Sequence, residues 1–167
     1  MKNIKSLLTI LSFVFLFSLA ASAQSLTALD GAKVDVQNQK GKVVVLAIGA
    51  SWLPLSKDQA VYTNKIAKKF AGRDVVVYFV ATDSTSAKSK NFASDDELTL
   101  FATGSKLNVT VLRDSDGAAT LKKYGVDQLP SFVILDKEGK QATEAFGGID
   151  PKSDISIPIS QAIERLL

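Results

Sequence analysis

The chain has 167 residues, of which 46% are hydrophobic and 22% charged, and this predicts a single compact domain with a sizeable core. Its formal net charge is +3, and its basic residues are interspersed with acidic ones, so a nucleic-acid partner is not expected. The absence of cysteine and histidine excludes disulfides, thiolate nucleophiles, Cys/His zinc sites and imidazole bases, and no cofactor is expected.

The N-terminus has the features of a signal peptide. Lys2 and Lys5 supply positive charge, Leu7–Ala21 is an apolar run, and small residues ending at Ala23 offer a cleavage site. Residues 1–23 are therefore predicted to be a signal peptide. An uncleaved anchor is the alternative, although the apolar run is shorter than the about 20 residues that a membrane-spanning helix needs.

Cleavage after Ala23 leaves residues 24–167 as one domain that is expected to be periplasmic or secreted, without a stable membrane span. Once Lys2 and Lys5 are removed, 18 basic residues stand against 17 acidic ones, so the mature protein is close to neutral. Export permits disulfides, yet this chain has no cysteine, so its stability must come from the core.

The mature chain is expected to open with a hairpin over Leu26–Val36 that turns at an Asp-Gly pair. The next segment, Val43–Ile48, is an apolar run without alternation, which is typical of a strand buried on both faces of a mainly parallel sheet. A buried helix would give the same run, but its shortness and the flanking Gly41 and Gly49 favour a strand.

A surface helix is predicted over Ser56–Phe70, because apolar residues recur there near the helical period: Ala60, Val61, Ile66, Ala67 and Phe70. A second buried strand is predicted over Val75–Ala81. Ser94 and Glu97 then have the spacing of a capping box, in which each side chain satisfies an orphan backbone donor. This motif predicts a helix from about Asp95 to Lys106.

The last third of the chain alternates between short strands and helices. The predicted elements are a strand over Val109–Leu112, a turn over Asp114–Gly117, a helix over Ala118–Tyr124, strands over Ser131–Leu135 and Gln141–Phe146, and a helix over Ile159–Leu167 after Pro158. The turn is faintly like the start of a calcium loop, but Gly125 stands where the closing glutamate is needed, so a plain turn is favoured. The whole order predicts a three-layer α/β fold.

Two segments resemble the thioredoxin superfamily, and more narrowly its exported TlpA-like thiol-disulfide reductases, which carry redoxin or AhpC-TSA-like domains. Gly41–Lys57 is similar to their strand and active-site turn, and Lys123–Lys140 is similar to their Tyr-Gly-Val, cis-proline, strand and Asp-x-x-Gly-Lys segment. The resemblance implies a thioredoxin-like α/β/α sandwich with a central mixed, partly parallel sheet.

The departures from the family pattern concern its chemistry. Where that branch has Ala-Ser-Trp-Cys-x-x-Cys, this chain reads Ala-Ser-Trp-Leu-Pro-Leu-Ser, with Leu53 and Ser56 at the two cysteine positions. Gln59 stands where many relatives carry a glutamate, and the strand before the turn offers no carboxylate. No catalytic residue is therefore expected, because neither half of a disulfide can form.

The resemblance leaves the binding part of the site in place. In relatives the cis-proline loop lies beside the turn, and its backbone pairs with an extended substrate chain. The corresponding candidate binding residues here are Trp52, Leu53, Pro54, Leu55, Leu129 and Pro130. The alternative is that Trp52, Leu53 and Leu55 pack into the local core.

Three functions follow as hypotheses. The first is a non-catalytic module that binds an extended polypeptide or a hydrophobic ligand. The second is an accessory partner of an exported redox protein, with any oxidoreductase label inherited from the fold. The third, an enzyme built on Ser56 and Lys57 or on Asp83, is disfavoured, because Ser56 is expected to cap the helix that starts there and Asp83 to serve a turn.

Overall fold

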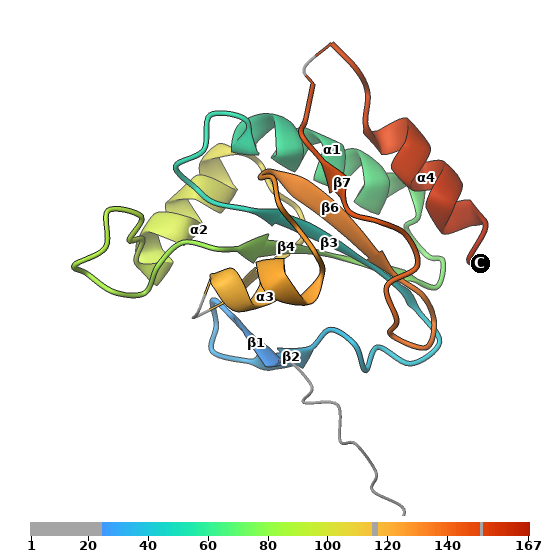
Figure 1. Ribbon diagram of the computed structural model, residues 1–167, viewed down its shortest axis with the longest axis horizontal. Coiled ribbons are helices and arrows are strands. Elements are labelled where there is room, and N and C mark those ends of the chain that lie inside the picture. The colour runs from blue at the N-terminus through green and yellow to red at the C-terminus, as the bar shows by residue number, and fades with distance from the viewer. Residues whose placement is uncertain (1–24, 115–116, 151) are drawn as a thin grey trace, which may run out of the picture.

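One seven-stranded sheet organises the protein (Figure 1). The computed structural model describes residues 25–114, 117–150 and 152–167, so the predicted signal peptide lies outside the described residues. The strand order is β2-β1-β5-β4-β3-β6-β7. The strands are β1 (Ser25–Ala28), β2 (Lys33–Asp35), β3 (Val43–Gly49), β4 (Val75–Ala81), β5 (Thr110–Arg113), β6 (Ser131–Leu135) and β7 (Phe146–Gly147).

The centre of the sheet is mixed. β3 pairs in parallel with β4 and antiparallel with β6, and β4 pairs in parallel with β5. All seven residues of β3 are buried, which confirms the prediction of a strand covered on both faces. The β1–β2 hairpin adds an antiparallel margin beside β5.

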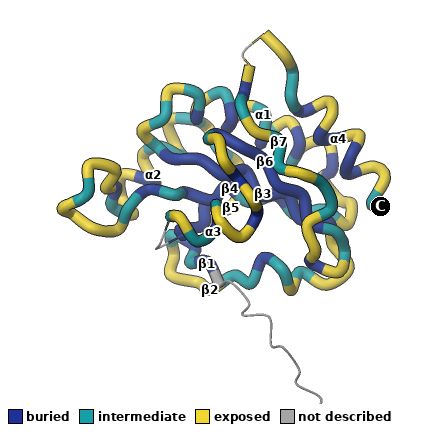
Figure 2. Tube along the Cα trace, in the orientation of Figure 1, coloured by how far each residue is buried: buried dark blue, intermediate teal, exposed yellow. Residues whose placement is uncertain are grey.

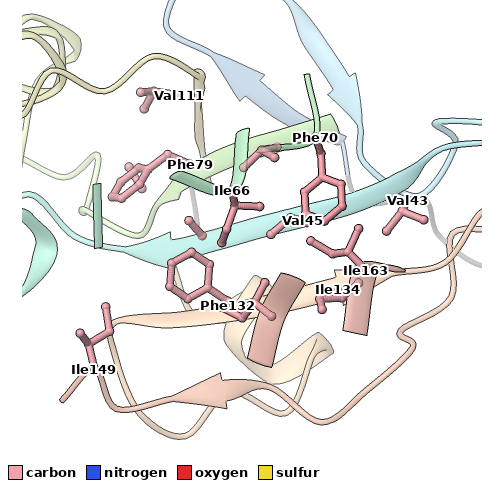
Figure 3. Packing of buried hydrophobic residues seen from close by; sticks show 14 of the residues in the cluster. Val43, Val45, Ile66, Phe70, Phe79, Val111, Phe132, Ile134, Ile149 and Ile163 are labelled. Carbon is pink, nitrogen blue, oxygen red and sulfur yellow. The ribbon is translucent and has the colours of Figure 1, made fainter. Parts of the chain in front are cut away.

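Helices cover both faces of the sheet. The described residues form four of them: α1 (Ser56–Lys69), α2 (Asp95–Gly104), α3 (Ala118–Lys123) and α4 (Ser156–Glu164). α1, α2 and α4 pack on one face, where Ile66, Phe70 and Ile163 meet Val43 and Val45 of β3 (Figure 3). The segment around α3 covers the opposite face, on which Val44, Leu46 and Ile48 lie. The thioredoxin-like α/β/α sandwich expected from the resemblance is therefore confirmed.

Alternation along β3 explains how one strand serves two cores. Successive side chains point to opposite faces of a sheet, so its odd-numbered positions join one cluster and its even-numbered positions the other. The buried strands form the continuous dark band at the centre of Figure 2. None of the helices in the described residues is long and apolar enough to cross a membrane.

Three expectations from the sequence need correction. The first is the strand over Gln141–Phe146, of which only a single bridge at Gln141 and the two residues of β7 exist. The side-chain amide of Gln141 donates to the carbonyls of Thr143 and Tyr124, at 3.0 and 3.2 Å. One of these bonds is local and the other ties the segment to Tyr124 at the end of α3, and the bridge at Gln141 is not continued as a ladder.

The second correction is that α4 begins at Ser156, before Pro158 rather than after it. Proline is tolerated in a first helical turn because its missing N–H would have no partner there. The third concerns Val61. Helical periodicity predicts that it lies on the buried apolar face of α1, but the residue is 50% exposed. Smaller differences are the end of α2 at Gly104 and a one-residue shift of β5.

Candidate functional site

The turn between β3 and α1 is fixed by its own hydrogen bonds. The Leu53 amide donates to the Ala50 carbonyl at 3.2 Å, and the Ser56 amide donates to the Leu53 carbonyl at 3.1 Å. The buried Ser56 hydroxyl also donates to the Ala50 carbonyl, at 2.7 Å. Ser56 therefore closes the turn with its side chain.

The expectation that Ser56 caps α1 was wrong. The N-cap residue is Leu55, which provides no side-chain hydrogen bond, and Ser56 is the first helical residue. A serine at that position has already turned into the helix, so its hydroxyl points back to the turn and reaches Ala50. The hydroxyl is fully buried while Lys57 is exposed, which speaks against a serine nucleophile activated by that amine.

A carboxylate from the neighbouring strand holds the other end of the turn. Asp83 lies two residues beyond the end of β4 and is fully buried. Its two oxygens accept from the Ser51 amide at 3.1 and 3.0 Å, and one of them accepts from the Ser51 hydroxyl at 2.6 Å. Sequence reasoning assigned Asp83 a local turn role and missed this contact across 32 residues of chain.

The proline loop lies directly beside this turn. The Leu129–Pro130 peptide bond is cis, and Ser131, the next residue, pairs with Ile48 of β3. Because β3 leads into the turn and β6 leaves the loop, this pairing joins the two segments that the sequence analysis selected from far apart in the chain. Pro130 itself is buried.

Gln59 ties the turn and the loop together. Its side-chain amide nitrogen donates to the Ile48 carbonyl at 3.0 Å and to the Ser131 carbonyl at 2.9 Å. The residue is fully buried, and its amide oxygen has no hydrogen-bond partner among the described residues. A Cβ atom at Gly49 would collide with that oxygen, so any larger residue at the end of β3 would have to displace the Gln59 side chain.

An amide suits this position better than a carboxylate. Two carbonyl oxygens face the same group, and only the NH2 of a glutamine can donate to both. An ionised glutamate would be repelled by both, and a protonated one could serve a single carbonyl. The tie that Gln59 makes is neutral and does not depend on pH.

The candidate binding residues differ in how far they reach the surface. Trp52 is 52% exposed and Pro54 is also exposed. Leu53 is half-buried, as are Leu55 and Leu129, which pack against the two core clusters. The core-packing alternative, which concerned Trp52, Leu53 and Leu55, thus describes Leu55 in part, while Trp52 is directed to solvent.

The backbone of the proline loop is unpaired at Leu129 among the residues that the structure describes. Neither the amide nor the carbonyl of Leu129 makes a hydrogen bond with any residue that the structure describes. Unpaired groups of this kind can accept an added strand. The described residues contain no cluster of three or more carboxylate, histidine or cysteine side chains that could hold a metal ion.

Comparisons with known proteins agree with this architecture. Residues 15–156 match the Redoxin family model. The chain is 29% identical over 121 residues to the thiol-disulfide oxidoreductase ResA of Bacillus thuringiensis subsp. konkukian, covering 72% of this chain and 64% of that protein. It is 31% identical over 115 residues to the thioredoxin-like protein YneN of Bacillus subtilis, covering 69% and 62%. The chain thus spans less than two thirds of the length of these relatives.

Solved structures show the same fold. The exposed lipoprotein thioredoxin Etrx1 of Streptococcus pneumoniae has a TM-score of 0.67 and 30% identity, and the match covers 86% of this chain and 98% of that one. A secreted disulfide oxidoreductase of Mycobacterium tuberculosis has a TM-score of 0.63 and 23% identity, covering 86% and 96%.

Proposed function

The chain belongs to the redoxin family of the thioredoxin superfamily, and from this premise we propose that it is a non-catalytic member that binds an extended polypeptide. Relatives carry names of thiol-disulfide oxidoreductases, but dithiol chemistry needs two sulfurs. This chain has no cysteine, and Leu53 and Ser56 occupy the two positions where the family's active-site motif has cysteines. The binding site comprises the turn over residues 50–56 and the loop at Leu129 and Pro130.

The observation that carries this proposal is the unpaired backbone of Leu129, in a loop that Gln59 ties to the turn bearing the exposed Trp52. An extended peptide could bond to the Leu129 amide and carbonyl by strand addition, and its side chains could pack on the indole ring. Asp83 fixes the Ser51 end of the turn, and Gln59 ties the turn to the loop, so neither contact needs a redox group. On this proposal, the binding of a polypeptide does not need the family's redox chemistry.

An extracytoplasmic location, periplasmic or secreted, is part of the proposal. It is supported by the N-terminal features of the sequence and by the pneumococcal relative, which is described as an exposed lipoprotein. The second candidate function, an accessory partner of an exported redox protein, uses the same surface. It would be favoured by copurification with a cysteine-bearing relative.

The binding test exploits the fact that Trp52 is the only tryptophan of the chain. Titration with S-carboxymethylated insulin B chain, a polypeptide without tryptophan, should shift the Trp52 emission to the blue in a saturable way. A Trp52→Ala, Leu53→Ala protein should lose binding to a fluorescently labelled B chain, while Ile157→Ala, which truncates an exposed apolar residue on α4, should not. Equal binding by all three proteins, or an unchanged Trp52 emission, contradicts the proposal.

The chemical half of the proposal is tested by insulin reduction with dithiothreitol. The natural protein should be inert, and a Leu53→Cys, Ser56→Cys protein should gain activity if the substrate groove is intact. Activity of the natural protein would refute the non-catalytic assignment. If the double variant folds but stays inert, the groove no longer accepts polypeptide and the binding proposal loses its basis.

A further inference from the structure

A cavity of about 600 Å3 lies against the solvent-facing side of α1, along the part of the helix that follows its first turn. Ligand pockets commonly have volumes of about 300–1,000 Å3, so this one is large enough for a small organic molecule. The opposite wall is the segment over residues 105–108, which follows α2. Neither wall belongs to the site proposed above.

The α1 wall consists of residues on a single face of the helix. Val61, Asn64, Lys65 and Lys68 follow the spacing i, i+3, i+4 and i+7, so their side chains lie one above another. Asn64 also fixes the opposite wall. Its amide nitrogen donates to the Lys106 carbonyl at 2.7 Å, and its oxygen accepts from the amide of Asn108 at 2.8 Å. The two walls are thereby held at a constant separation.

The lining combines an apolar surface with positive charge. Val61 is 50% exposed here, and with Ala67 it offers apolar contact. Three lysines line the cavity, and no carboxylate does. Lys65 is already paired with Asp154 at 3.0 Å, whereas Lys68 and Lys106 form no ion pair with the described residues.

This combination selects an anion that carries an aliphatic chain. Lysine ammonium groups bind carboxylates as point charges, and an exposed valine gains when a chain removes it from water. We propose that the cavity binds a small amphiphilic carboxylate, whose chain lies on Val61 and Ala67 and whose head is held by Lys68 and Lys106. The position of Val61, which has no role in the core, is explained by this contact.

The experiment is an NMR titration of the purified protein with octanoate below its micelle-forming concentration. Saturable chemical-shift changes are expected at Val61, Ala67 and Asn108. A Lys68→Gln, Lys106→Gln protein should bind about tenfold more weakly, because two surface ion pairs are lost. The matched control Lys88→Gln, Lys90→Gln removes the same charge from the loop before α2 and should bind like the natural protein.

Two further probes make the result decisive. Octylammonium, which has the same chain and the opposite charge, should not bind, and acetate, which lacks the chain, should bind far more weakly than octanoate. Equal binding of octanoate and octylammonium would overturn the role of the lysines. Equal weakening by the two lysine pairs would overturn the assignment to this cavity, and so would the absence of saturable shifts at its residues.

Discussion

Replacing Gln59 by glutamate tests the neutral tie between the turn and the proline loop. Gln59 donates to two carbonyl oxygens inside the core, at 3.0 and 2.9 Å. A protonated glutamic acid has one O–H and leaves one carbonyl unpaired, which costs about 1–3 kcal/mol at any pH. An ionised glutamate faces both oxygens without solvent, so its pKa must rise above the unfolded value of about 4.3.

The direction of the pH effect follows from this rise. Because the pKa of the introduced glutamate is higher in the folded protein than in the unfolded one, its ionisation lowers the free energy of unfolding further. This second, pH-dependent loss is absent below about pH 4.3 and grows as pH rises toward the pKa of the folded state. The loss grows by about 1.4 kcal/mol per pH unit, so a rise of about three units, which buried glutamates reach, costs about 4 kcal/mol near neutral pH.

The assay is urea denaturation of Gln59→Glu across pH 4 to 8, a range that brackets the reference pKa of about 4.3, followed by circular dichroism. Gln161→Glu places the same new charge on the exposed side of α4 and serves as the matched control. Gln59→Leu should lose stability without added pH dependence. If Gln59→Glu and Gln161→Glu show the same pH dependence, the buried tie does not exist as described.

Three further predictions concern other polar groups. The buried Tyr124 hydroxyl has no hydrogen-bond partner in the part of the chain that the structure describes, so Tyr124→Phe should be at least as stable as the natural protein. Burial and a nearby acidic charge raise the pKa of Tyr124 to about 12, so alkaline urea denaturation of the natural protein should show a stability loss above the ordinary tyrosine pKa that Tyr124→Phe lacks. Ser94→Ala should lower the free energy of unfolding by about 1 kcal/mol, measured by thermal or urea unfolding. The hydrogen bonds from Ser94 lower the pKa of Glu97, so the stability difference between the variant and the natural protein should shrink as pH falls through the titration of Glu97. A difference that stays constant with pH would contradict this. Asp83→Ala, which removes both acceptor oxygens, should free the Ser51 end of the turn and increase acrylamide quenching of the neighbouring Trp52. Unchanged quenching would show that the turn holds without the carboxylate.

Local signals in the sequence were sufficient for much of the fold. The unbroken apolar run of β3 and the Ser94 capping box each depend on residues within one segment, and both were predicted correctly. The strand expected over Gln141–Phe146 failed because a side-chain amide competes there with the ladder, and hydrophobic patterning does not record that competition. The prediction that Val61 lies on the buried face of α1 was wrong, because helical periodicity does not reveal a cavity beside the helix.

The candidate site was predictable in outline and not in its contacts. The turn and the proline loop were selected by family resemblance, and their adjacency follows from the pairing of β3 with β6. The roles of Asp83 and Gln59 depend on contacts across 32 and 72 residues of chain. No local pattern encodes such contacts. The sequence therefore indicates only a turn role for Asp83, and for Gln59 only a departure from the glutamate of many relatives.

The margins of the sheet have a consequence for how copies of the protein meet one another. β2 has three residues and β7 has two, so neither outer strand presents a ladder long enough for a second copy to continue. Short outer strands are a known protection against edge-to-edge aggregation. A protein whose proposed partner binds by strand addition can in this way keep one short segment of backbone open while its own copies stay apart.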